Sequence, residues 1–265
     1  MAQPIKGPGI FYVRTAITPS PHNPLTEAEF MHWYDDDHIA EVVQTSGISN
    51  AFRYFHCDKI PDIGTPTAEC PRPYLALYPM PELAFTQGQE FKDIRVKSDM
   101  LPGTGICYDM ADFDVGIYAL AGQSGNGKGG SGGYLVTSEI EPASDATDDQ
   151  VNAFFDNQSE SISRLENYQR SLRFRLLYAR TNAQSRNLKG LAPATDEPAP
   201  EPPSWLQIHE FSAEPAADAR STIRDDGHAL LKEAKQQEAH AYRLQRAHGQ
   251  KQFFESAEIG PLGWL

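Results

Sequence analysis

One histidine near the start of the chain has the spacing of an acid–base group on the buried side of a helix. Phe30, Tyr34, His38 and Val42 follow one another at steps of four residues. At about 100° per residue these four side chains share the apolar face of a predicted helix. Imidazole titrates close to neutral pH, so His38 could move a proton with little tuning. The sequence predicts His38 as the catalytic residue; a core histidine held by hydrogen bonds is the alternative.

The acidic run beside this histidine does not predict a metal site. Asp35, Asp36 and Asp37 are consecutive, and three consecutive helix residues point in three directions and cannot converge on one ion. His32 and Asp36 have i, i+4 spacing, but nothing indicates the further ligands that a metal needs. We therefore interpret the run as a solvated helix flank and predict neither metal nor cofactor.

Polar residues on the predicted strands could line a pocket with His38. We select Tyr12, Tyr34, Arg53 and Tyr74 as substrate-binding residues, with a tyrosine or Arg53 able to stabilise developing oxyanion charge. A void of roughly 300 Å³ or more beside His38 would favour a ligand site over a packed core. In the second half, four histidines lack ligand spacing and are predicted at the surface: His209, His228, His240 and His248. His56 lies at a strand end and is also predicted to be exposed.

The elements that must position these residues occur twice along the chain. Thr26 with Glu29 and Thr147 with Gln150 both fit a capping box, and 121 residues separate the two threonines. Each helix follows a strand rich in β-branched and aromatic residues. The predicted strands are 10–17, 51–55, 74–78 and 113–118 in the first copy, and 134–140, 172–178, 205–209 and 242–246 in the second. Second helical stretches are predicted over 81–99 and 216–236.

Each copy therefore has the order β-α-β-β-α-β, and the fold class is α+β with tandem ferredoxin-like units. One such sheet has helices on one face only, so its other face needs a cover, which the second copy supplies. We predict an N-terminal unit (1–121), a Gly-rich linker (122–133) and a C-terminal unit (134–265). The linker fits G-x-x-x-x-G-K, but Gly129 and a strand follow where a phosphate loop needs Ser or Thr and a helix.

Composition narrows the partners. The 265 residues carry a net charge of −13 and 40% are hydrophobic, which disfavours nucleic acid and anionic membranes and allows a packed core. Three cysteines argue against a disulfide scaffold, with Cys57 and Cys70 predicted as reduced thiols rather than a pair. No apolar signal sequence or membrane span is apparent, so we predict a cytoplasmic protein that is a monomer or a homodimer.

Residues 26–39, with Trp33-Tyr34 followed by His38 near the helix end, resemble the EthD-like branch of the dimeric α+β barrel proteins. Ala40 stands where that family often has proline. Segments 74–83 and 98–105 look like parts of two-domain fungal members, and the resemblance covers 1–121 better than the second half. It implies a pseudo-dimeric barrel with a pocket between sheet and helices, in which His38 would be the acid–base residue.

The resemblance also implies a class of chemistry. We expect a lyase or isomerase without metal or nucleotide, acting by decarboxylation, cyclisation or dehydration on an aromatic or polyketide-like molecule in secondary metabolism. A cofactor-free EthD-like monooxygenase and a non-catalytic binding or scaffold protein are the alternatives. Ser159 replaces His38 in the second copy at the 121-residue offset, which indicates one working pocket and one structural copy. Some relatives bind haem, so haem binding stays an open alternative, which a brown colour of the purified protein would indicate.

Overall fold

The computed structural model describes residues 5–18, 25–68, 70–125, 132–192, 196–216, 219–224 and 228–250. Eight strands form its sheet: β1 Gly9–Ile17, β2 Asn50–His56, β3 Tyr74–Met80, β4 Ala111–Ser124, β5 Tyr134–Glu141, β6 Tyr168–Arg180, β7 Trp205–Phe211 and β8 Gln236–Gly249. The α-helices are α1 Glu27–Trp33, α2 Ile39–Val42, α3 Gln89–Asp93, α4 Asp148–Ile162, α5 Asn182–Leu188, α6 Ala219–Arg224 and α7 Ala229–Glu233. A π-helical segment, η1 Tyr34–His38, joins α1 to α2, and the 3₁₀ turns are η2 Leu83–Gln87 and η3 Cys107–Asp109.

The eight strands close into one barrel in the order β1-β3-β2-β8-β5-β7-β6-β4. Each copy contributes four consecutive positions, and both copies use the order last-first-third-second that a ferredoxin-like unit has. The copies join through the antiparallel pairs β2–β8 and β4–β6. The chain therefore has the predicted α+β fold, a pseudo-dimeric barrel made from tandem ferredoxin-like units. β1 and β5 are four places apart in this ring of eight strands, so they lie opposite each other. Because all neighbouring strands are antiparallel, β1 and β5 run in the same direction.

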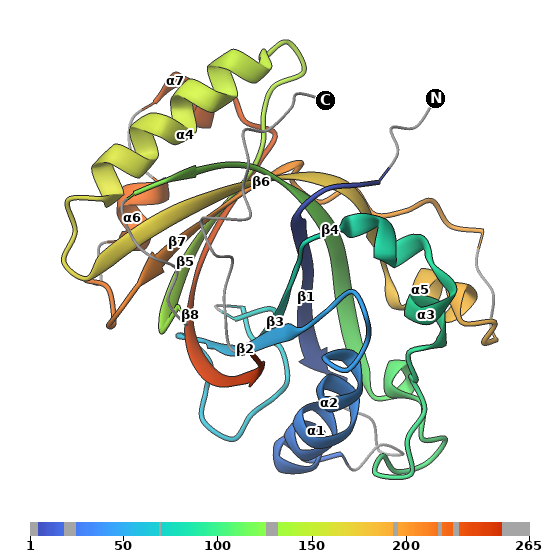
Figure 1. Ribbon diagram of the computed structural model, residues 1–265. Helices are drawn as coiled ribbons and strands as arrows, with labels where there is room; N and C mark the ends of the chain where they lie inside the picture. The colour runs from blue at the N-terminus through green and yellow to red at the C-terminus, as the bar shows by residue number, and fades with distance from the viewer. Residues whose placement is uncertain are drawn as a thin grey trace.

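Helices cover the outside of the barrel on two sides (Figure 1). In the first copy α1 and α2 pack on the outward face of the sheet, where Val13, Ala76 and Tyr78 meet Phe30 and Trp33. In the second copy α4, α6 and α7 form two smaller cores on the opposite side. The inward faces of both sheets form a third core, made of side chains such as Ile10, Phe52, Leu77, Leu172, Phe174 and Ile208.

Local sequence fixes where the helices begin. The Thr26 and Thr147 side chains accept from the amides of Glu29 and Gln150, and the capping box is complete at both sites. A third capping box, Thr181 with Gln184, begins α5. No helix was predicted between the strands 172–178 and 205–209, so α5 is an addition to the predicted order of elements.

The first helix departs from regular α-helical geometry where the acidic run lies. Within η1 the amide of Ile39 donates to the carbonyl of Tyr34, the i→i+5 pattern of a π-turn. This turn widens the helix and rotates the residues that follow relative to an ideal wheel. Asp35 is buried at 6% exposure, so its interpretation as part of a solvated flank was wrong.

The second helical stretches are shorter than predicted. Over 81–99 the chain forms only η2 and α3, and over 216–236 only α6 and α7 among the described residues. In the predicted linker, β4 continues to Ser124 and residues 126–131 lie outside the described residues, as do 251–265 of the C-terminal unit. Among the described helices none is both long and apolar enough to cross a membrane.

Candidate functional site

The inside of the barrel is apolar in its middle and ionised at both ends. Arg170 and Glu210 form a fully buried ion pair at one end, and a larger cluster of ionised groups lies at the other. This second end, called the barrel mouth here, lies where β1 and β5 finish. Arg14 and Glu139 both point inward there, since each alternates with the outward-facing residues of its strand. The Glu139 side chain is fully buried and Arg14 is mostly buried. Burying charges inside a barrel is unfavourable unless they are paired, so this cluster marks the mouth as a candidate site.

The cluster is built around the Arg14 guanidinium. Its Nη1 lies 2.9 Å from Glu238 Oε2 and 3.5 Å from Glu139 Oε1. The Tyr12 hydroxyl donates to the same Glu139 oxygen at 3.0 Å. Burial and the Glu139 carboxylate raise the pKa of Tyr12 well above its ordinary value, so the hydroxyl stays a donor. The other carboxylate oxygen, Glu139 Oε2, is buried and has no hydrogen-bond partner among the described residues.

A chain of hydrogen bonds fixes the tautomers of two histidines behind Glu238. The backbone amide of Asp58 can only donate, and it donates to His56 Nδ1 at 3.1 Å. His56 Nε2 therefore carries the proton and donates to His240 Nδ1 at 3.2 Å. His240 Nε2 then donates to Glu238 Oε2 at 3.2 Å. The hydrogen bond from His240, together with Arg14, lowers the pKa of Glu238 to about 2.

The hydrogen bonds through His56 and His240 decide between a metal site and an ion-pair network. Glu139, Glu238 and His240 each bring a potential ligand atom within 4.8 Å of the others, the one such group of three in the described part of the chain. A metal would need the Nε2 lone pair of His240. That nitrogen is a donor in the tautomer that the Asp58 amide imposes, and Arg14 already contacts both carboxylates. The arrangement therefore favours an ion-pair network over metal ligation.

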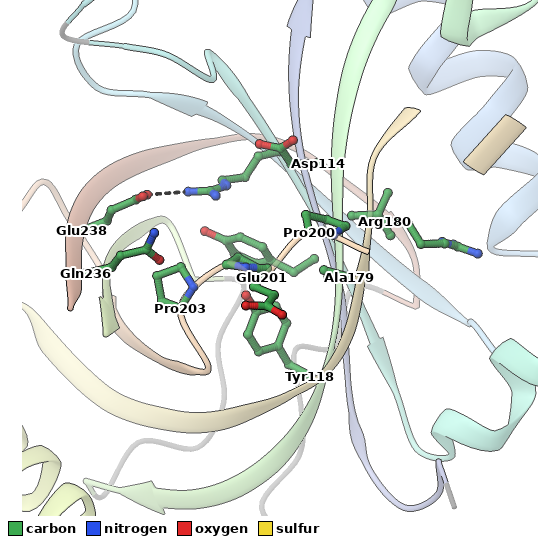
Figure 2. Close-up of a pocket in the computed structure, with 14 residues that line it drawn as sticks. Asp114, Tyr118, Ala179, Arg180, Pro200, Glu201, Pro203, Gln236 and Glu238 are labelled. Atoms are coloured by element: carbon green, nitrogen blue, oxygen red, sulfur yellow. Dashed lines mark hydrogen bonds and ion pairs between the residues drawn. The ribbon is translucent and has the colours of Figure 1, made fainter. Parts of the chain in front are cut away.

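A pocket of about 240 Å³ is lined by Tyr12, Arg14 and Glu238 of this cluster, whereas Glu139, which contacts Tyr12 and Arg14, is not part of the lining. Its lining combines Tyr12, Arg14, Asp114, Gly116, Tyr118 and Glu238 from the strands with Pro200, Glu201, Pro202 and Pro203 from the segment before β7. Figure 2 shows Pro200, Glu201 and Pro203 between Glu238 on one side and Asp114 and Arg180 on the other. Arg180 points its guanidinium away from Glu238 and Gln236.

Gly116 makes room for the Tyr118 ring, and both residues line the pocket. It pairs with Tyr12 on β1, and an added Cβ would lie 2.4 Å from a ring carbon of Tyr118. In the second copy His240 holds the matching place, because it pairs with Thr137 on β5 as Gly116 pairs with Tyr12. The mouth is therefore asymmetric, with Gly116 at this position in one copy and His240 in the other.

The structure places His38 on the other side of the sheet, among the helices. Its ring stacks on Trp33 and Tyr34, with centroids 5.3 and 5.8 Å apart. Nδ1 lies 3.2 Å from the carbonyl oxygen of Arg95, an acceptor, so Nδ1 carries the proton and Nε2 keeps its lone pair. Burial lowers the pKa of His38 to about 4, which leaves it neutral at pH 7.

No pocket described here includes His38 in its lining. Besides the barrel mouth there is a small one of about 150 Å³ beside α7. Two larger surface depressions, of about 660 and 980 Å³, lie over α4 and over β6 with α5. None of these three brings buried ionised groups together as the barrel mouth does.

The four predicted substrate-binding residues separate into two groups. Tyr12 lines the barrel mouth, whereas Tyr34 and Tyr74 are buried in the core under α1. Arg53 also faces outward, and its Nε and Nη2 donate to the two Asp35 oxygens at 2.7 and 2.6 Å. Burial raises the pKa of Tyr34 to about 12. The sheet therefore separates Tyr12 from His38.

Several histidines predicted at the surface are buried instead. His56 is 3% and His209 0% exposed, and burial lowers the pKa of His209 to about 3. His248 donates to Asp35 Oδ1 at 3.1 Å, close to Arg53. Barrel closure sets β8 beside β2 and so brings His240 to His56 and His248 to Asp35, although these residues are far apart in the sequence.

Sequence reasoning also missed Glu139, Glu238 and His240. The available signal was a charged residue at an inward position of a strand that is otherwise apolar, as in Leu135-x-Thr137-x-Glu139. It pointed to polar contacts inside the barrel but could not identify the partner.

Comparisons with known proteins support the fold. No protein-family model matches the chain, and no curated protein matches it in sequence. An anthrone oxidase-like protein of known structure superposes with a TM-score of 0.55 at 13% identity, covering 95% of this chain and 96% of that one. Candidate monooxygenases from Fusobacterium nucleatum and Lactobacillus acidophilus give TM-scores of 0.46 and 0.47 at 9% and 7% identity, over 93% of this chain and 96% and 98% of theirs. At these identities the likeness shows the shared fold alone.

Proposed function

We propose that this protein is a small-molecule enzyme whose substrate binds in the barrel mouth and is transformed by acid–base chemistry. The observation that carries the proposal is the ionised cluster of Tyr12, Arg14, Glu139 and Glu238 beside a pocket. The other ion pair buried in the barrel, Arg170 with Glu210, lines none of the described pockets. Stability alone does not explain these ionised side chains, because hydrophobic residues would fill the same space at lower desolvation cost. Groups held this way recur at catalytic sites.

The residues have distinct roles in this proposal. Glu139 is the proton acceptor, since its Oε2 is the cluster oxygen without a partner among the described residues. Glu238, with a pKa of about 2, is a weak base and instead holds Arg14 in place. Arg14 stabilises negative charge that develops on the substrate, and Tyr12 orients the Glu139 carboxylate. Removal and return of one proton suits a lyase or an isomerase.

The size of the pocket restricts the substrate. About 240 Å³ is less than the roughly 300–1,000 Å³ usual for drug-sized ligands. We therefore propose a substrate with a single ring, at the small end of the aromatic or polyketide-like class that the resemblance implies. Kinship with EthD-like proteins is part of the proposal, as is a monomeric working unit, because the barrel closes within one chain. A cytoplasmic location and a role in secondary metabolism stay predictions from the sequence.

His38 is a second candidate for the base. Its neutral ring, with Nδ1 bonded to Arg95 and Nε2 retaining a lone pair, has the electronic state of a general base. In that case the substrate would have to reach the helix side of the sheet. A cofactor-free monooxygenase is the alternative reaction, supported by the fold shared with an anthrone oxidase-like protein.

Hydrogen–deuterium exchange separates these candidates. One-ring aromatic ketones, phenylacetone first, are incubated in D₂O under nitrogen, and loss of the α-proton signal is followed by NMR. We expect exchange above the buffer rate that falls at least 10-fold in Glu139→Gln and is unchanged in His38→Gln. The reverse result assigns the base to His38.

Two further outcomes would overturn the acid–base proposal. Binding of the ketones without exchange would leave a binding protein, and oxygen uptake in air without exchange under nitrogen would favour the monooxygenase. Glu160→Gln, which removes a 69%-exposed carboxylate on α4, is the matched control.

A further inference from the structure

We propose that the barrel mouth recognises an organic cation, a protonated amine carried on a small apolar or aromatic body. The inference rests on the proposed site and adds the charge of its ligand. It begins from a count of the ionised groups at the mouth. Arg14 is shared by Glu139 and Glu238, so this group carries one net negative charge.

A second guanidinium at the mouth is shared in the same way. Arg72 contacts Asp112 and Asp114, both at 2.8 Å, and Asp114 lines the pocket. The remaining arginine of the lining, Arg180, lies over the rings of Tyr178 and Phe91, 5.7 and 6.0 Å from their centroids, and points away from Glu238 (Figure 2). Glu201 adds a further carboxylate. The pocket is therefore electronegative, and a cation entering it would be attracted.

Glu139 is a further acceptor next to the lining, in contact with the lining residues Tyr12 and Arg14. Its side chain is 1% exposed, and Oε2 has no partner among the described residues. Leaving a buried carboxylate oxygen without a hydrogen-bond donor is unfavourable, because the desolvation of the charged group is not compensated. An N–H donor from a ligand would supply that compensation, and a charged donor makes the stronger bond.

The tautomer of His240 favours an amine over a metal ion. An ammonium group needs only acceptors, and the mouth offers carboxylate oxygens of Glu139 and Glu238. A metal would also need the His240 Nε2 lone pair, but this nitrogen donates to Glu238. Freeing that lone pair would move the proton of His240 to Nδ1. His56 Nε2 would then have to accept from His240, and His56 Nδ1 could no longer accept the hydrogen bond of the Asp58 amide.

The rest of the lining suits an apolar body. The Tyr12 and Tyr118 rings meet edge to face with centroids 5.8 Å apart, and the Tyr118 ring packs over Gly116. Pro200, Pro202 and Pro203 cover the outer side of the pocket. Aromatic rings next to carboxylates are also a favourable environment for an organic cation.

Calorimetric titration with four probes at pH 7 tests the proposal. Benzylamine is the cation, benzyl alcohol its neutral counterpart, benzoate the anion, and MnCl₂ the metal alone. We expect benzylamine to bind at least 10-fold more tightly than benzyl alcohol or benzoate. Glu139→Gln should weaken benzylamine at least 10-fold, and Glu160→Gln on α4 should leave it unchanged.

A second variant keeps the test valid if Glu139→Gln does not fold. The Glu238 side chain is 42% exposed, so Glu238→Gln is expected to fold and to weaken benzylamine as well. Tighter binding of benzoate that is lost in Arg14→Met would overturn the cation while keeping the site. Mn²⁺ binding that depends on Glu139, without benzylamine binding, would replace the amine by a metal. If all four probes fail to bind folded protein, the cation and the proposed pocket both fall.

Discussion

Arg14 and Glu139 occupy equivalent places in the two copies and meet inside the barrel, with Arg14 Nη1 3.5 Å from Glu139 Oε1. Arg14 lies opposite Leu75 on the third strand of its copy, and Glu139 opposite Leu206 on the third strand of the other. A homodimer of identical chains would put the same residue at both places. Fusion of the copies allowed them to diverge into opposite charges, and with them an asymmetric mouth.

Removal of the shared cation should destabilise the protein. Arg14→Met leaves Glu139 buried without its ion pair, and we expect a loss of about 3–5 kcal/mol in the free energy of unfolding at pH 7. The double variant Arg14→Met with Glu139→Leu should recover most of this loss, because no buried charge stays unpaired. Urea denaturation measures both, and equal stabilities of the single and double variants would contradict the pairing.

Asp35 should make the ion pairs between the copies sensitive to acid. Burial alone would raise its pKa, but hydrogen bonds from His248 and Arg53 lower the pKa well below its ordinary value. Its contribution is therefore complete above about pH 4 and is lost as the pH falls further. Asp35→Asn should lower stability by about 3–5 kcal/mol at pH 7, with a smaller difference at pH 3. Asp36→Asn, at a 42%-exposed site, should change it by less than about 1 kcal/mol.

Burial of His38 should make the folded protein less stable in acid, because the folded state keeps this histidine neutral. Its pKa is about 4 in the folded chain and near 6.5 when unfolded, so the unfolded state binds more protons between these values. Stability should rise by about 3 kcal/mol from pH 4 to 6.5 on this account. His38→Gln should remove that slope in denaturation curves, whereas His32→Gln, whose side chain is 67% exposed, should keep it. An NMR titration of His38 with a midpoint near 6.5 would show the prediction to be wrong.

Filling the pocket should abolish binding with a limited effect on the fold. The added methyl group of Gly116→Ala would meet the Tyr118 ring at 2.4 Å, which displaces the ring into the pocket at a cost of about 1–3 kcal/mol. We expect benzylamine affinity to fall at least 10-fold. Gly122→Ala on the same strand is the control, since its nearest atom, the Cβ of Arg173, lies 3.8 Å away. Retained affinity in Gly116→Ala would place the ligand elsewhere.

The repeat, its strands and the first turn of each long helix could be predicted from local sequence. The capping boxes at Thr26 and Thr147 are local devices whose partners lie three residues away, and β-branched runs indicate strands wherever they occur. The π-turn at Tyr34–His38 could not be predicted, because its energy depends on packing around the helix. The burial of Asp35 could not be predicted either, because its partners Arg53 and His248 come from β2 and β8.

The candidate site was beyond reach for a different reason. The alternation that placed Tyr12 and Arg14 on one face of a strand is local, but it does not say whether that face meets helices or the other copy. The amino-acid sequence by itself determined the duplicated βαββαβ order and the residues able to move protons. Only barrel closure decided that Arg14 meets Glu139, 125 positions away, and that His38 lies on the far side of the sheet, because a charge pair across a barrel depends on which strands become neighbours.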